Sequence, residues 1–234
     1  MEKALEVKGL VSGYGNKQVL NEVSLYVRKK EIVLLVGHNG AGKTTMLSTI
    51  YGLIPQRGGQ VLLYGEPVHQ LRTEQIVRKG MALTPQGHGI FPRLTVADNL
   101  DLASYSVSDK RWIEKRKKEI YEMFPILYER RNQRAGTMSG GQQQMLAIGL
   151  SLMSNPKVLL LDEPSIGLAP VIVENLMNSI REIVERFDAS VLLVEQNVTQ
   201  GLRIADRVYA MKLGEIVGEE EAKSVDMEKL WQMF

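Results

Sequence analysis

The chain has 234 residues, of which 44% are hydrophobic and 24% charged, ordinary proportions for a folded protein that exclude long disordered stretches. It contains no cysteine, which excludes disulfide bonds and thiolate metal sites. Its 29 basic and 27 acidic residues give a formal net charge of +2, so no global field attracts nucleic acid.

The N-terminal part is predicted to form strands that bury one face. Apolar residues alternate there with polar or charged ones, a pattern typical of half-buried strands. The alternating residues are Leu5, Val7, Val23, Leu25 and Val27.

Nearly continuous apolar runs follow, which is typical of parallel strands covered on both faces. They lie at residues 32–36, 158–161 and 191–194. A helical pattern follows each run, at residues 42–50, 170–186 and 199–205. The alternation of strand and helix predicts a doubly wound α/β core with a mostly parallel sheet.

The middle of the chain has helical patterns and no candidate strand. The helices are expected at residues 96–103, 108–124 and 142–153. We therefore predict one domain over residues 1–234, in which 1–91 and 154–234 form the α/β core and 92–153 form an inserted helical subdomain.

The sequence GHNGAGKT, from Gly37 to Thr44, fits the pattern G-x-x-x-x-G-K-[ST] between a predicted strand and helix. Its glycines let backbone N–H groups converge on phosphate oxygens, Lys43 can reach the β- and γ-phosphates, and Thr44 can offer its hydroxyl to Mg²⁺. A glycine-rich turn with a chance lysine is the alternative, which the flanking strand and helix disfavour. The predicted nucleotide-binding residues are Gly37, His38, Asn39, Gly40, Ala41, Gly42, Lys43, Thr44 and Thr45.

Two acids end the apolar run at 158–161, at the edge of the sheet where ligands bind. Asp162 is predicted to hold Mg²⁺ through water, and Glu163 to polarise the attacking water as general base. Capping of the next helix is the alternative role of both acids. Together with the glycine loop, they predict the binding and hydrolysis of a nucleoside triphosphate.

A third motif opens the helix expected at 142–153. Ser139, Gly140, Gly141 and Gln142 place a serine and two glycines at a helix start, which makes a second anion-binding N-terminus. An ordinary capped helix is the alternative, which the motif taken alone disfavours but does not exclude.

With these three motifs the sequence resembles the ATP-binding subunits of ABC transporters over nearly its whole length. The resemblance implies ATP and Mg²⁺ as cofactors, and two such domains meeting head to tail so that each signature, residues 139–142, closes on the partner's ATP. It implies that Tyr14 stacks on adenine and that Gln86 senses Mg²⁺ and faces the membrane partner. Residues 165–170 would cross the dimer interface. Three positions depart from the family pattern: Met138 replaces leucine, Ala169 replaces aspartate, and Gln196 replaces a histidine.

At the position of the family's switch histidine, this chain has Gln196. Glutamine can hydrogen-bond a γ-phosphate, but it can carry neither a proton from it nor a positive charge. The resemblance therefore implies that Gln196 is a catalytic contact that supports slow hydrolysis, with Glu163 still in place as the base.

Segments 90–96, 165–170 and 193–197 resemble one ATPase of the branched-chain amino-acid uptake systems and of their relatives for urea and short amides. This resemblance implies an importer with a sister ATPase, integral membrane permease subunits and a periplasmic solute-binding protein. A homodimer remains an open alternative to the sister ATPase. The urea and amide branch also remains open, because the chain would never touch the solute.

Location follows from the lack of membrane signals. The apolar runs are far shorter than the ~20 residues of a membrane helix, and the first six residues do not resemble a signal peptide. We expect a cytoplasmic protein, held at the inner face of the cell membrane by permease subunits.

Two rival functions remain. One is an ABC ATPase acting on DNA or ribosomes; the basic run at 110–118 is interleaved with acids, which favours a solvated helix face, so no nucleic acid is expected. The other is a regulatory ATPase acting through membrane subunits.

At the C-terminus, Met227, Leu230, Trp231 and Phe234 are predicted to share one helix face that docks on the core, with a partner contact as the alternative.

Overall fold

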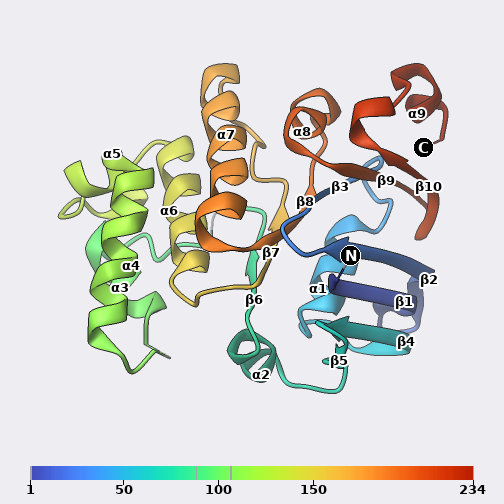
Figure 1. Cartoon of the computed structure of the whole chain (residues 1–234), viewed down its shortest axis with the longest axis horizontal. Helices are drawn as coiled ribbons and strands as arrows, with labels where there is room; N and C mark the ends of the chain where they lie inside the picture. The colour runs from blue at the N-terminus through green and yellow to red at the C-terminus, as the bar shows by residue number, and fades with distance from the viewer. Residues whose placement is uncertain (1, 88, 106, 234) are drawn as a thin grey trace.

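The computed structural model describes residues 2–87, 89–105 and 107–233, and within them the chain folds into two β-sheets with helices between and beside them (Figure 1). Phe234, the last residue of the predicted C-terminal face, lies outside the described residues.

The antiparallel sheet is built from the N-terminal part of the chain. Its strand order is β2-β1-β4-β5, and neighbouring strands run antiparallel. Leu5 and Val7 on β1, and Val23, Leu25 and Val27 on β2, are buried, so the predicted burial of one face is confirmed. The strands are β1 (Lys3–Tyr14), β2 (Lys17–Arg28), β4 (Gln56–Leu63) and β5 (Glu66–Pro67).

The second sheet is mostly parallel and has the order β10-β9-β3-β8-β7-β6. Strands β9, β3, β8, β7 and β6 are parallel neighbours, and β10 pairs antiparallel with β9 at one edge. All residues of β3, β7 and β8 are buried, which confirms the reading of the three apolar runs. The strands are β3 (Ile32–Val36), β6 (Met81–Thr84), β7 (Val158–Asp162), β8 (Ser190–Val194), β9 (Arg207–Lys212) and β10 (Glu215–Glu221).

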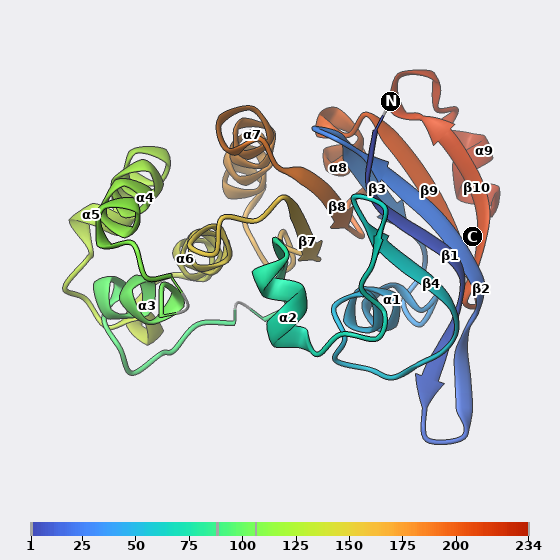
Figure 2. The same ribbon diagram turned by 60° about the horizontal axis from the view of Figure 1, so that its bottom comes forward.

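The helices fall into two groups, and Figure 2 shows both around the sheets. Those between β6 and β7 in sequence pack together on one side, with α7 between them and the sheets (Figure 1). They are α3 (Val96–Ala103), α4 (Lys110–Met123), α5 (Pro125–Glu129), the short 3₁₀ helix η1 (Ala135–Thr137) and α6 (Gly140–Leu152). The others are α1 (Lys43–Ile50), α2 (Thr73–Arg78), α7 (Pro170–Phe187), α8 (Val198–Ile204), η2 (Ala222–Ser224) and α9 (Met227–Met233). No helix among the described residues is long and apolar enough to cross a membrane.

Two hydrophobic cores hold the parallel sheet in place, one on each face. Leu34 of β3 shares a core with Ile180 of α7 and Val198 of α8. Its neighbour Leu35 points the other way and shares a core with Leu47 of α1 and Leu5 of β1. Because side chains alternate along a strand, both faces of β3 are packed. The carboxyl ends of β3, β6, β7 and β8 are therefore fixed relative to one another, and the loops that follow them meet along one edge.

Candidate functional site

The loop between β3 and α1 follows a path that requires glycine. Gly42, which caps α1, has φ of 110°, where any side chain would be strained. A Cβ atom on Gly37 would lie 2.3 Å from the carbonyl oxygen of Met211 in β9. The loop therefore passes directly over β9 before α1 begins. The first N–H groups of a helix have no helical partner, so this arrangement offers an anion several backbone donors.

Lys43 folds back into the loop that carries it. Its ammonium group donates hydrogen bonds to the carbonyl oxygens of Gly37 at 2.8 Å and His38 at 3.3 Å. It also lies 3.5 Å from Oε1 of Glu163, and both side chains are buried. A buried ammonium group with a flexible stem is thus held at the centre of the loop, within reach of any phosphate that enters it.

Asp162 ends β7 directly opposite the start of α1. The Thr44 hydroxyl donates a hydrogen bond of 3.2 Å to Asp162 Oδ1. Burial raises the pKa of the Asp162 carboxyl, and the nearby charge of Glu163 raises it further, while the Thr44 hydrogen bond and Lys43 act in the opposite direction. A hydroxyl and a carboxylate side by side suit Mg²⁺, a hard cation that takes oxygen ligands and keeps several waters.

The raised pKa of Asp162 predicts a pH-dependent effect of Asp162→Asn. The folded state holds the proton of Asp162 more tightly than the unfolded state does. The contribution of Asp162 to the free energy of unfolding therefore falls as the pH rises from the ordinary pKa of 3.8 through the raised pKa. Asparagine does not titrate and keeps an oxygen for Thr44. We therefore expect the free energy of unfolding of the variant, relative to the wild type, to be greater at pH 7 than at pH 4. Denaturant unfolding at both pH values, without nucleotide and with EDTA, measures the difference. A constant difference would contradict the assigned burial effect.

Glu163 receives donors from three elements. Its Oε2 atom accepts hydrogen bonds from Gln86, which follows β6, at 3.1 Å and from Gln196, which follows β8, at 2.8 Å. Its Oε1 atom faces Lys43. The residue has φ of 48°, a left-handed conformation that is uncommon outside glycine. A strained backbone at a buried carboxylate is a feature of functional sites.

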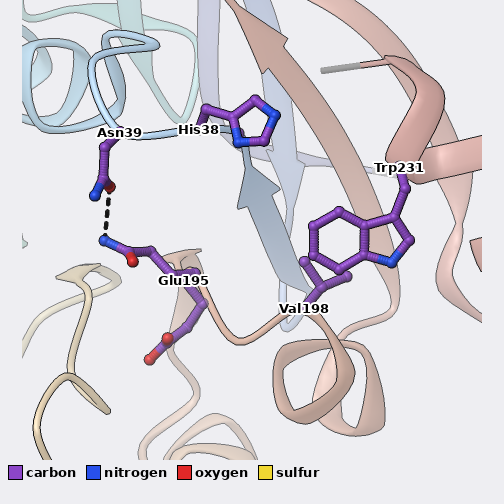
Figure 3. Close-up of a pocket in the computed structure, with 7 residues that line it drawn as sticks. His38, Asn39, Glu195, Val198 and Trp231 are labelled. Carbon is purple, nitrogen blue, oxygen red and sulfur yellow. Dashed lines mark hydrogen bonds between the residues drawn. The ribbon is translucent and has the colours of Figure 1, made fainter.

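Gln196 connects this carboxylate to the glycine loop. Its side-chain amide donates a second hydrogen bond, of 2.8 Å, to Oδ1 of Asn39, the dashed line in Figure 3. Behind that bond lies a cavity of about 380 Å³ lined by His38, Val198 and Trp231 among others. Asn39 and Gln196 also line the cavity in front. Both residues of this hydrogen bond therefore line two cavities.

The front cavity has a volume of about 500 Å³ and collects most of the predicted nucleotide-binding residues. Tyr14, at the end of β1, is 53% exposed and reaches it, and the Thr45 hydroxyl lies 3.5 Å from the Tyr14 hydroxyl. Gly37 and His38 line the cavity behind instead, and Ala41 is buried. The front cavity is lined by Tyr14, Lys17, Val19, Asn39, Gly40, Gly42, Lys43, Thr44, Thr45, Gln86, Glu163, Ile166 and Gln196.

Three of these lining residues are not among those predicted to bind nucleotide or Mg²⁺ or to act in catalysis, although one of them, Ile166, belongs to the segment 165–170 predicted to cross a dimer interface. Lys17 and Val19 begin β2 after the turn that follows Tyr14, and Ile166 belongs to the loop after Glu163. The only local signal is a basic residue three positions after Tyr14, which is too weak to assign. Their place in the cavity depends on how the two sheets pack.

The signature residues lie elsewhere. Ser139 caps α6: its hydroxyl accepts a hydrogen bond from the Gln142 N–H at 3.4 Å, and its own N–H donates to Gln142 Oε1 at 3.1 Å. Ser139 and Gly140 are exposed, Gly141 is buried, and none of the four lines the front cavity. The described part of the chain thus keeps these residues apart from the phosphate loop.

Two weaker predictions also have a structural outcome. The basic residues of α4 pair along the helix, for example Lys115 with Glu119 at 3.7 Å and Lys118 with Glu122 at 3.9 Å. At the C-terminus Leu230 is buried in the main core, while Trp231 is 49% exposed. The α9 helix is therefore docked through Leu230, and Trp231 is left facing the cavity behind the glycine loop (Figure 3).

Comparison with known proteins gives a consistent set of matches. The family model described as "ABC transporter" matches residues 20–166. The chain is 48% identical over 204 residues to the high-affinity branched-chain amino acid transport ATP-binding protein BraG of Pseudomonas aeruginosa, covering 87% of each sequence. It is 37% identical over 207 residues to the probable branched-chain amino acid transport ATP-binding protein LivF of Archaeoglobus fulgidus, covering 88% of this chain and 87% of that one.

A solved structure also has the same fold. The ADP conformation of an ATP-binding cassette of an ABC transporter superimposes with a TM-score of 0.86 and is 26% identical, covering 99% of both chains. The antiparallel sheet, the parallel sheet and the helical group between β6 and β7 are therefore all parts of a fold already known.

Proposed function

Because this chain belongs to the ABC transporter family, as one of its ATP-binding and ATP-hydrolysing subunits, we propose that it powers an importer of branched-chain amino acids or chemically similar small solutes. The observation that carries this proposal is the 48% identity with BraG, which extends over 87% of both sequences. The glycine loop, the two acids at the end of β7 and the front cavity give that assignment a chemical basis.

We propose that the front cavity binds ATP by its phosphates at the start of α1. Backbone N–H groups of the loop and the Lys43 ammonium group would exchange their present partners, such as the Gly37 carbonyl oxygen, for phosphate oxygens. Tyr14, half exposed at the rim, offers its ring to adenine. Thr44, Asp162 and Gln86 would hold Mg²⁺, which supplies charge neutralisation on the phosphates when bound.

Glu163 is the proposed general base. A buried carboxylate that now binds Lys43, Gln86 and Gln196 becomes available to a water molecule once Lys43 turns to the phosphates. Gln196 is the proposed γ-phosphate contact, since its amide already spans the distance between the loop residue Asn39 and Glu163. It can orient but not transfer a proton. We therefore propose slow turnover in this chain's own site.

The separation of the signature from the front cavity supports a two-chain site. We propose that Ser139, Gly140, Gly141 and Gln142 close on the ATP of a second ATPase, and that residues 92–153 form the helical subdomain that presents them. A sister ATPase is the proposed partner, with a second copy of this chain as the alternative. Integral membrane permeases would hold the pair at the inner face of the cell membrane, and a periplasmic solute-binding protein would deliver the solute.

The test is to isolate the tagged chain from its native membranes in mild detergent and to identify the subunits that accompany it. We expect two membrane subunits and one sister ATPase. After reconstitution with the solute-binding protein of the same system, leucine should stimulate ATP hydrolysis several-fold, whereas urea and acetamide should not.

Each alternative gives a different result in this experiment. Stimulation by urea or acetamide but not by leucine would assign the chain to the urea and amide branch. Membrane subunits without a solute-binding protein would favour a regulatory ATPase. Isolation together with nucleic acid that salt releases would favour an ABC ATPase that acts on DNA or ribosomes.

A further inference from the structure

One buried carboxylate beside the site has no role in the proposed chemistry. Glu195 directly follows β8 and is 1% exposed. Its Oε1 atom accepts the backbone N–H of Ser165 at 2.9 Å, and its Oε2 atom accepts the Ser165 hydroxyl at 2.7 Å. Figure 3 shows its carboxylate pointing away from His38 and Trp231. Burying a charge is costly unless it is fully hydrogen-bonded, so this pair of bonds is a specific attachment.

The attachment fixes the loop between β7 and α7. Ser165 is itself 8% exposed, and its carbonyl oxygen accepts the N–H of Leu168 at 3.2 Å. The N–H of Ile166 donates to the Glu163 carbonyl oxygen at 3.2 Å. Because the loop is short and turns on itself, holding Ser165 positions everything between Glu163 and the start of α7 at Pro170.

The far side of this loop packs against the signature residues. A Cβ atom on Gly140 would lie 3.6 Å from Leu168 Cδ2, an ordinary contact distance. A Cβ atom on Gly141 would lie 2.6 Å from Ile172 Cγ2, closer than any side chain could approach. Gly141 is therefore packed directly on the first turn of α7, and Gly140 lies beside Leu168 at the end of the loop.

These contacts form a continuous connection across the molecule. Gln196, which lines the front cavity, is the next residue after Glu195 in the chain. Glu195 holds Ser165, and the Ser165 loop leads through Leu168 into α7, where Ile172 packs so closely on Gly141 that a Cβ atom would not fit. A shift of the Gln196 segment must therefore move the loop under the signature or break the Glu195 bonds.

We propose that Glu195 is a positioning residue that couples the phosphate-facing Gln196 of this chain to its own signature. The inference rests on the proposed roles of those two elements in ATP hydrolysis. Occupancy of one ATP site would then be transmitted to the signature that completes the other site. Glu195 touches no reacting atom, so its loss should affect turnover rather than the binding of ATP to the phosphate loop.

The experiment compares Glu195→Ala, Glu195→Gln, Ser165→Ala and the double variant Glu195→Ala/Ser165→Ala in the purified complex. We expect ATP affinity within about twofold of the wild type and kcat lower by about tenfold for Glu195→Ala, the loss of about one charged hydrogen bond. Glutamine keeps an acceptor for Ser165, so Glu195→Gln should recover most of that loss. The double variant should be no slower than Glu195→Ala, because the two residues act as one unit.

The control is Glu185→Ala, which removes an exposed carboxylate of α7 and should leave kcat unchanged. Wild-type turnover in Glu195→Ala, or ATP affinity falling in parallel with kcat, would overturn the inference. If Glu195→Ala does not fold, Glu195→Gln with Ser165→Ala decides: both at wild-type kcat overturns the inference, and a lower kcat in Ser165→Ala at unchanged affinity supports it. A wild-type complex that neither binds nor hydrolyses ATP would instead refute the proposed function.

Discussion

Replacing Glu163 with glutamine is expected to slow ATP turnover strongly and to leave ATP bound. A general base contributes a factor of roughly 10²–10⁴ to a rate, and glutamine cannot accept the proton of the attacking water. The substitution leaves the glycine loop unchanged. The side-chain oxygen of glutamine can still accept a hydrogen bond from Gln86 or Gln196. We therefore expect kcat to fall by about 10²–10⁴-fold in the full complex, with ATP affinity equal to or higher than that of the wild type, since a negative charge near the triphosphate is removed.

Two measurements separate this result from general damage. Single-turnover phosphate release reports the chemical step, and equilibrium binding of ATP reports the cavity; an ATP-stabilised dimer should accumulate on gel filtration. Glu185→Gln, on the exposed side of α7, is the matched control and should behave as the wild type. Phosphate release at the normal rate in Glu163→Gln would remove Glu163 from the role of base.

The parts of the site that lie close in sequence are predictable from the sequence. The glycine loop is specified by eight consecutive residues, and its strand is a five-residue apolar run whose bounds, Ile32–Val36, the structure reproduces. Asp162 is the last residue of β7, and Glu163 directly follows it. In each case the signal is local, because the apolar run of the strand and the functional residues next to it are consecutive in the sequence.

The convergence of Gln86, Glu163 and Gln196 is not predictable in this way. These residues are far apart in sequence and meet because β6, β7 and β8 are adjacent parallel strands. Alternation of strands and helices predicts a parallel sheet but not its order. The family resemblance predicts roles for Gln86 and Gln196. The hydrogen bonds from Gln196 to Asn39 and from Ser165 to Glu195 are seen only in the three-dimensional structure.

Some strands are missing from the sequence prediction for a different physical reason. β4 begins with a glycine-rich segment, and β10 carries several glutamates, both unusual in strands. β9 begins with Arg207, a charged residue that is nevertheless 1% exposed. Its guanidinium group pairs with Glu31 at 3.0 Å and stacks over the Tyr26 ring at 3.9 Å. Burial of an arginine depends on partners that only the fold brings together.

Replacing Lys43 with alanine is expected to abolish tight ATP binding. The ammonium group is the one full positive charge that the glycine loop carries into the front cavity, and hydrogen bonds to charged groups contribute about 1.5–3 kcal/mol each. We therefore expect the Kd for ATP to rise by at least about tenfold to a hundredfold. Equilibrium binding of a fluorescent ATP analogue, with Lys118→Ala on the exposed face of α4 as control, measures the change. Undiminished binding would contradict the assignment of the loop as a phosphate site.

Replacing Lys43 is also expected to lower the stability of the fold, and a second variant separates this effect from the loss of ATP binding. Lys43 pairs with the buried Glu163 at 3.5 Å, and removing one partner of a buried ion pair typically costs about 3–5 kcal/mol, because the other charge stays buried and uncompensated. The double variant Lys43→Ala/Glu163→Gln removes both charges. It should regain most of the lost stability in thermal unfolding without regaining ATP affinity. If ATP affinity returned together with stability, the lysine would act only by holding the fold, and the phosphates would have to be bound by the backbone alone.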